Sequence, residues 1–302
     1  MKIAAPASNL EEIRHYAKLK VDEIYLGFKS PAERKWSTLN KRNEPLSNFS
    51  SLQDISQVKK LNTYSEISLT LNYPFYGPKL LRAAKKQVIS FKDYIDNFII
   101  SAPSIIQLVK KHAPEKGIIL SCIYPCFNSR TASFFSSLGI KKIILPRHLT
   151  VKEITGLAVA NPEIRFEAMV INQYCKNIDG FCSRCHIPTK KGEFTTCSFP
   201  SVNRLCCLGK TTSKETVQKN INSISQYNPF CGLCFIKQFH DAGIDSIKIV
   251  GRSNPTERKK TDIEMIKKAM SNVHLSQPDY IDFCRQLFRE YFFHNCKNNC
   301  YY

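Results

Sequence analysis

Short apolar or β-branched runs alternate along this sequence with longer stretches in which apolar residues recur at helical spacing. Eight of these runs are short enough to be strands, at residues 2–6, 23–28, 66–72, 97–101, 117–123, 142–146, 164–170 and 245–250. The stretches between them predict helices, among them 10–17, 103–112, 129–138 and 150–159. Such alternation is typical of βα units, in which each helix returns the chain so that the next strand lies parallel to the last.

Eight strands with intervening helices predict an α/β fold of the (β/α)-barrel type. An open, doubly wound sheet produces the same alternation and is the alternative. After the last strand, residues 255–272 and 277–294 predict two further helices. We therefore expect a barrel domain over residues 1–272 and a C-terminal helical tail over residues 273–302.

One connection is far longer than the others. Residues 171–244 separate the seventh and eighth predicted strands, and they hold eight of the 13 cysteines of the chain. In a barrel, the segment after strand seven leaves from the carboxyl ends of the strands, where barrel active sites are built. The sequence therefore predicts a Cys-rich, metal-binding insertion over the mouth of the barrel.

The composition is that of an ordered globular protein, with 43% hydrophobic and 23% charged residues. Forty-four Lys and Arg against 25 Asp and Glu give a net charge of +19, which favours partners such as RNA or an anionic small molecule. The sequence shows neither a secretory signal nor an 18-residue apolar run, so we expect no membrane span and a cytoplasmic location. Cysteines there are thiols, and closely spaced ones are candidate metal ligands.

Two Cys-x-x-Cys motifs mark the insertion, Cys182/Cys185 and Cys231/Cys234. Four thiolates suit either a structural zinc or an iron–sulfur cluster, and the residues alone do not choose between them. Unligated buried thiols are the third interpretation. The His-Glu-x-x-His and Gly-x-Ser-x-Gly motifs of conventional hydrolases do not occur, so no peptidase mechanism is visible in the sequence.

Several further segments occur in a fixed order. They are Ala-Ala-Pro-Ala-Ser-Asn at 4–9, Val-Asp-Glu-Ile-Tyr-Leu-Gly at 21–27, Leu-Pro-Arg-His-Leu-Thr at 145–150 and Lys-Ile-Val-Gly-Arg at 248–252, with shorter matches at 70–72, 121–128, 167–175 and 180–182. Together they resemble the collagenase-like peptidase family, peptidase family U32. The resemblance spans roughly residues 1–255, and the ordered series is more specific than any one motif.

The resemblance implies a protein that binds a four-iron, four-sulfur cluster and supports oxygen-independent hydroxylation. Branches of this family act in ubiquinone biosynthesis or in hydroxylating RNA, and others carry a protease label. The four cluster ligands that the resemblance implies are Cys175, Cys182, Cys197 and Cys234. Cys185 and Cys231 are spare neighbours that could replace one of these four.

Four positions depart from the family pattern. His148 replaces a Glu, Asn172 and Gln173 replace a His-Gly pair, and Val250 replaces the Glu of the closing motif. If those family residues transfer protons, this chain acts on another substrate or lacks turnover.

Three cations keep their family positions at the ends of predicted strands: Arg147, Lys248 and Arg252. We expect them to be the catalytic cations, which would hold a carboxylate or phosphate of the substrate. Ion pairs that close the barrel are the alternative role.

The leading hypothesis is an iron–sulfur-dependent, hydroxylase-like protein that acts on RNA or on a quinone precursor. The positive charge favours RNA. A collagenase-like protease is one alternative, and a zinc-stabilised RNA-binding or partner-binding protein without catalysis is another. A second protein of the same family is an expected partner.

Overall fold

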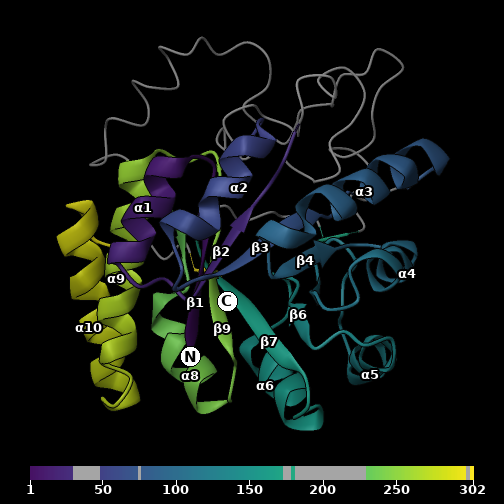
Figure 1. Ribbon diagram of the computed structural model, residues 1–302. Helices are drawn as coiled ribbons and strands as arrows, with labels where there is room; N and C mark the ends of the chain where they lie inside the picture. Colours follow the sequence, from purple (N-terminus) through teal and green to yellow (C-terminus); the bar gives the residue numbers. More distant parts are fainter. Residues whose placement is uncertain (30–47, 74–75, 173–177, 181–228, 297–299) are drawn as a thin grey trace, which may run out of the picture.

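The computed structural model describes residues 1–29, 48–73, 76–172, 178–180, 229–296 and 300–302 (Figure 1). Its sheet contains β1 (Lys2–Ala7), β2 (Glu23–Leu26), β3 (Glu66–Leu71), β4 (Asn97–Ile100), β5 (Gly117–Leu120), β6 (Lys142–Ile144), β7 (Arg165–Asn172), β8 (Phe230–Cys231) and β9 (Ser246–Ile249). Each of the eight predicted strands is present, and β8 is an addition that the sequence did not predict.

Eight of these strands close on themselves. The hydrogen-bonded order runs from β1 through β2, β3, β4, β5 and β6 to β7, then to β9 and back to β1, and every pairing in this circuit is parallel. The fold is therefore the predicted (β/α)-barrel, and the open-sheet alternative is excluded. Since parallel strands share one direction, all their carboxyl ends meet at one mouth.

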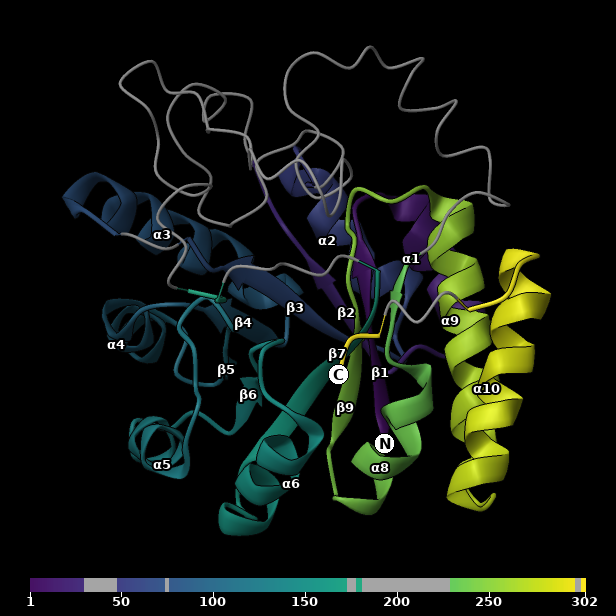
Figure 2. The same cartoon turned by 180° about the vertical axis from the view of Figure 1, so that it is seen from behind.

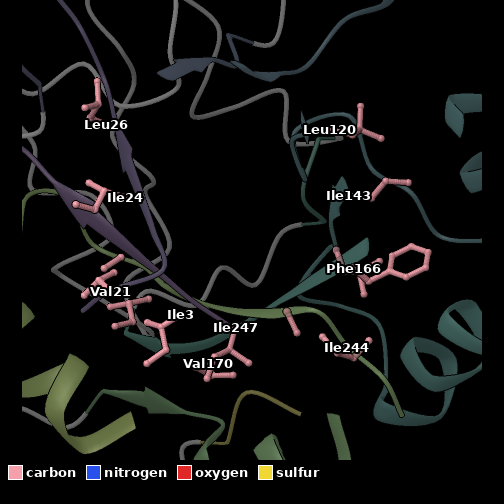
Figure 3. Packing of buried hydrophobic residues seen from close by; sticks show 14 of the residues in the cluster. Ile3, Val21, Ile24, Leu26, Leu120, Ile143, Phe166, Val170, Ile244 and Ile247 are labelled. Atoms are coloured by element: carbon pink, nitrogen blue, oxygen red, sulfur yellow. The ribbon is translucent and has the colours of Figure 1, made fainter. Parts of the chain in front are cut away.

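Side chains alternate between two environments along each strand, as a pleated strand requires. In β2, Ile24 and Leu26 belong to the large apolar layer between strands and helices, part of which Figure 3 shows. Glu23 and Tyr25, at the intervening positions, point into the barrel, where they meet side chains from other strands. The inward positions thus carry the polar residues that later form the site.

Helices surround the barrel (Figure 1). They are α1 (Leu10–Lys18), α2 (Leu52–Leu61), α3 (Pro78–Phe91), α4 (Pro103–His112), α5 (Ser129–Ser137), α6 (Val151–Ala160), α8 (Ile236–Asp241), α9 (Thr256–Ser271) and α10 (Gln277–Phe292). All the helices predicted above are present within a few residues of their expected bounds. None of the helices in the described ranges is both long and apolar enough to cross a bilayer.

The first helix shows how local sequence sets an element boundary. The side chain of Asn9 caps α1 by accepting a hydrogen bond from the Glu12 backbone N–H at 3.0 Å. The Glu12 carboxylate reaches back and accepts from the Ser8 backbone N–H at 2.8 Å. This exchange holds the Glu12 carboxylate in a buried position, from which it contacts a residue that supports the barrel mouth.

The end of the chain returns to the barrel. Helix α10 packs on α9, and the Tyr280 hydroxyl donates to the Ala269 carbonyl at 3.2 Å. Residues 300–302, which we call the returning segment, then lie along β8: Cys300 pairs with Cys231, and the Tyr301 N–H donates to the Cys231 carbonyl at 3.0 Å. Figure 2 shows this yellow chain end beside β7 and β9. The domain boundary at 272/273 stays a prediction.

Candidate functional site at the barrel mouth

Four charged side chains meet inside the barrel and form what we call the charge chain, which consists of Glu23, Lys142, Glu167 and Lys248. Lys142 Nζ lies 2.5 Å from Glu23 Oε2 and 2.6 Å from Glu167 Oε2. Lys248 Nζ lies 2.8 Å from Glu167 Oε1. All four are buried, and the two positive and two negative charges balance. The charge chain therefore crosses the barrel interior as a neutral unit in which every charge has an opposite partner.

The pKa of Glu167 shows how strongly this unit holds its charges. Burial alone would raise the pKa of the carboxyl, but the ammonium groups of Lys142 and Lys248 outweigh it and lower the pKa to about 2. The Ser246 hydroxyl adds a hydrogen bond to Glu167 Oε2 at 3.0 Å. Glu167 is therefore a carboxylate at any physiological pH and anchors both lysines.

Lys248, one of the three expected catalytic cations, lies in this chain. Besides Glu167, its Nζ contacts the face of the Tyr25 ring at 3.6 Å from the centroid. The Tyr25 hydroxyl in turn donates to the Ile249 carbonyl at 2.7 Å. This placement matches the ion-pair alternative stated above, and a role toward substrate stays a prediction.

Arg147, the second expected cation, lies just beyond β6 at the mouth. Its guanidinium forms a two-pronged ion pair with Asp179, with Nε 2.9 Å from Oδ2 and Nη2 2.5 Å from Oδ1. The neighbouring Gly180 has a φ of +84°, and a Cβ there would lie 2.5 Å from the Ile123 carbonyl oxygen. Glycine at this position thus lets the Asp179 turn seat against the loop after β5 and reach Arg147.

Arg252, the third expected cation, lies at the same end of the barrel. Its Nη1 donates to the Thr70 hydroxyl at 2.9 Å. A Cβ on Gly27 would lie 1.9 Å from this nitrogen and 2.3 Å from Asn48 Oδ1, so glycine makes the room that the guanidinium occupies. The structure therefore brings Arg147 and Arg252 to the same mouth, at the carboxyl ends of β6 and β9.

A buried lysine of α9 supports the Arg252 loop. Lys259 Nζ donates to the Arg252 carbonyl at 2.8 Å and lies 2.7 Å from Glu12 Oε1. Burial lowers the pKa of Lys259 against the opposing effect of Glu12. The cap of α1 and the first turn of α9 thus hold the mouth together from outside the barrel.

Two of the departures from the family pattern contact one another. Asn172 Nδ2 donates to the Val250 carbonyl at 2.9 Å and to Asp262 Oδ2 at 2.7 Å. The backbone of Asn172 has a φ of +79°, a left-handed conformation that Asn adopts more readily than most residues. Asp262 also pairs with Arg258 at 2.8 Å, and burial raises the pKa of its carboxyl. The side-chain amide of Asn172 thus connects the end of β7 to the residue that follows β9 and to α9.

Of the four expected cluster ligands, the described residues include Cys234 alone. Cys175, Cys182 and Cys197 lie outside them, as does Cys185. Within the described ranges, no group of three or more His, Cys, Asp or Glu is placed to hold a metal ion. The metal site predicted for the insertion therefore stays a prediction.

The surroundings of Cys234 fit a thiolate ligand. Strand β8 pairs Cys231 with Ile171 near the carboxyl end of β7 and runs antiparallel to β7, and Cys234 follows three residues later in a short 3-10 helix beside α10. A hydrogen bond from the Cys284 thiol of α10 lowers the pKa of the Cys234 thiol against the effect of burial. A metal ligand must be deprotonated, so this environment favours ligation by Cys234.

Sequence reasoning missed several residues that the structure brings to the site. Glu23, Lys142 and Glu167 form most of the charge chain, and Asp179 and Tyr301 both contact Arg147. A charged residue inside an otherwise apolar strand was the available signal for the first three, since an unpaired charge cannot be buried there. No comparable local signal marks Asp179 or Tyr301.

The chain is similar in sequence to known proteins. The model of peptidase family U32 matches residues 8–298 of the chain. Proteins named tRNA hydroxylation protein P are similar to it: that of Helicobacter pylori (strain J99) is 26% identical over 185 residues, which is 60% of this chain and 42% of that protein. The protein of Escherichia coli (strain K12) is 27% identical over 184 residues, 60% of this chain and 38% of that protein.

A solved structure of the U32 peptidase Mk0906 aligns with 56% of this chain and 68% of its own, with a TM-score of 0.42 and 11% identity. The chain spans about two fifths of the length of the curated relatives it matches. The family match, by contrast, runs in one stretch from residue 8 to residue 298, and so includes β2 to β9, the insertion and most of the tail. The chain belongs to peptidase family U32.

Proposed function

We propose that this chain supports the hydroxylation of RNA and holds an iron–sulfur cluster through Cys175, Cys182, Cys197 and Cys234. The observation that carries the substrate class is the similarity, over 60% of the chain, to proteins named tRNA hydroxylation protein P. The net charge of +19 supports the same class, since phosphate groups attract a strongly basic protein.

The barrel mouth supports the placement of the cluster. The insertion that holds Cys175, Cys182 and Cys197 begins where β7 ends at Asn172, and Arg147 and Arg252 lie at the same end of the barrel. A cluster bound there would supply electrons to a substrate held over the mouth. Arg252, which Thr70 and the loop of Lys259 hold in place, would orient an anionic or carbonyl group of that substrate.

Metal analysis tests the cofactor. We would purify the protein anaerobically, record its visible absorption and measure iron, sulfide and zinc in the wild type and in Cys182→Ala and Cys234→Ala. Cys126→Ala, which removes another buried thiol, is the matched control. A brown protein with about four irons per chain, lost in both ligand variants and kept in the control, supports the proposal. A colourless protein with about one zinc refutes the cluster and favours a zinc-stabilised binding protein.

Nucleoside analysis tests the substrate. RNA from cells with and without the gene would be digested, and its nucleosides compared by mass spectrometry for the gain of one oxygen atom. Arg252→Gln should abolish most of any such gain, whereas Arg14→Gln, which changes an exposed arginine of α1, should leave it unchanged. If no nucleoside changes and the protein instead cleaves collagen peptides when all four cysteines are absent, the protease alternative replaces the proposal.

A further inference from the structure

The side chain of Tyr301 lies inside the barrel mouth. It is 3% exposed and packs with the inward-facing cluster of the strands, which includes Ile99, Ile119, Ile144 and Met169. These residues come from β4, β5, β6 and β7, so the phenol ring lies over the barrel interior rather than against an outer helix. The ring therefore occupies space at the mouth where a barrel enzyme receives its substrate.

Polar contacts surround the edge of this ring. The Arg147 guanidinium hydrogen-bonds to the phenol oxygen, and Asp179, which pairs with Arg147, lies close by. Burial raises the pKa of the phenol well above its ordinary value, so the hydroxyl stays protonated. The ring thus has an apolar floor and one cationic hydrogen-bond donor at its edge.

Hydrogen bonds and ring packing of the returning segment hold the Tyr301 ring in place. The Tyr301 N–H donates to the Cys231 carbonyl at 3.0 Å, and the Tyr302 hydroxyl donates to the Met169 carbonyl at 2.8 Å. The Tyr302 ring packs against Phe235 and Phe239 at centroid distances of 5.7 and 5.1 Å. These contacts, together with the Arg147 hydrogen bond and the packing of the Tyr301 ring, lie outside the circuit of paired barrel strands, so the segment can separate without any change in the strand pairing.

A pyrimidine base matches the place of this phenol. Both are flat six-membered rings, and the exocyclic oxygen of a pyrimidine is an acceptor for which Arg is a suitable donor. An enzyme that modifies a base must take that base out of its stack and into a pocket. We propose that Tyr301 occupies the pocket that receives a pyrimidine base of the RNA, and that the returning segment leaves it when the base enters. This inference rests on the proposed function for its choice of ligand.

Cavity filling tests the proposal without any need for turnover. Tyr301→Gly should open a pocket with the shape of the lost side chain. The probe is p-cresol, which is the tyrosine side chain as a free molecule, and calorimetry should show that it binds this pocket. Uridine 5′-monophosphate should bind this variant about tenfold more tightly than it binds the wild type, because the segment no longer competes for the pocket. Tyr64→Gly removes an exposed ring and is the matched control, with affinities equal to those of the wild type.

Two results would overturn the proposal. If Tyr301→Gly binds p-cresol but binds the nucleotide no better than the wild type, the pocket does not receive a base. If it binds uridine 5′-monophosphate more weakly than the wild type, Tyr301 is a wall of the site that stacks on the ligand rather than its occupant. Tighter nucleotide binding without any hydroxylated RNA would leave this inference standing and refute the proposed function.

A measurement on the wild type covers the case in which the variant fails to fold. Hydrogen exchange of the Tyr301 amide reports directly on its bond to the Cys231 carbonyl. A uridine-rich RNA oligonucleotide should speed this exchange about tenfold, while amides inside β1 keep their rates. Unchanged or slower exchange at Tyr301 in the presence of bound RNA would contradict the release of the segment.

Discussion

Replacing Glu167 by Gln should destabilise the protein in a way that depends on pH. The variant keeps the shape of the side chain but leaves Lys142 and Lys248 without their shared counter-charge inside the barrel. Removing one partner of a buried ion pair costs about 3–5 kcal/mol. The pKa gives a similar size, since the gap between the ordinary 4.5 and about 2 corresponds to about 3 kcal/mol.

The sign of the pH dependence follows from the direction of the shift. Because folding lowers the pKa of Glu167, its contribution to stability is fully present above the ordinary pKa of 4.5 and is lost as the pH falls through about 2. We therefore expect wild type and Glu167→Gln to differ by about 3 kcal/mol at pH 7. This difference should shrink toward zero between pH 4.5 and pH 2, where the wild-type carboxyl also becomes neutral.

Urea unfolding over a series of pH values measures this difference directly. Glu264→Gln removes an exposed carboxylate of α9 and is the matched control, with a difference from wild type that stays below about 0.5 kcal/mol. A difference for Glu167→Gln below about 1 kcal/mol at pH 7, or one that stays constant down to pH 2, would refute the reasoning.

Two further substitutions probe the mouth. Gly27→Ala should lower the unfolding free energy by about 1–3 kcal/mol in urea, because its Cβ would displace the Arg252 guanidinium. Gly156→Ala, whose Cβ meets no atom within 4 Å, should instead leave stability equal or higher, and an equal loss in both would contradict the steric account. Asp179→Asn weakens the buried pair of Arg147, so thermal unfolding should show a loss of about 3 kcal/mol, and an unchanged melting temperature would show that the pair contributes nothing.

Much of the fold was predictable from the sequence because the residues of each long strand have the composition and length that predict a strand. Runs such as 117–123 combine β-branched side chains with the length of a buried strand, and β5 lies within that run. Closure into a barrel was less certain, since it depends on the pairing of β6 with β7 and of β7 with β9, which local periodicity does not encode. Strand β8 has only two residues, too few to produce any pattern.

The site was predictable only in part, because some of its contacts join segments that are distant in the sequence. A cation that directly follows a predicted barrel strand is expected at the mouth, so the location of Arg147 and Arg252 was predictable. Their partners come from distant segments: Asp179 reaches Arg147 from the insertion and Tyr301 reaches it from the returning segment. Contacts of this kind depend on tertiary packing and leave no spacing rule in the sequence.

The charge chain ties together strands that never pair. Glu23 on β2 and Lys142 on β6 are 119 positions apart in sequence and meet across the barrel interior. If two half-barrels formed separately, Glu23 in the first half would lack Lys142, and in the second half Lys142 and Lys248 would share the single carboxylate of Glu167. Burial of such unbalanced charge is unfavourable. We therefore expect the barrel to gain or lose its structure in a single cooperative transition, and a fragment that ends before β6 should not fold by itself.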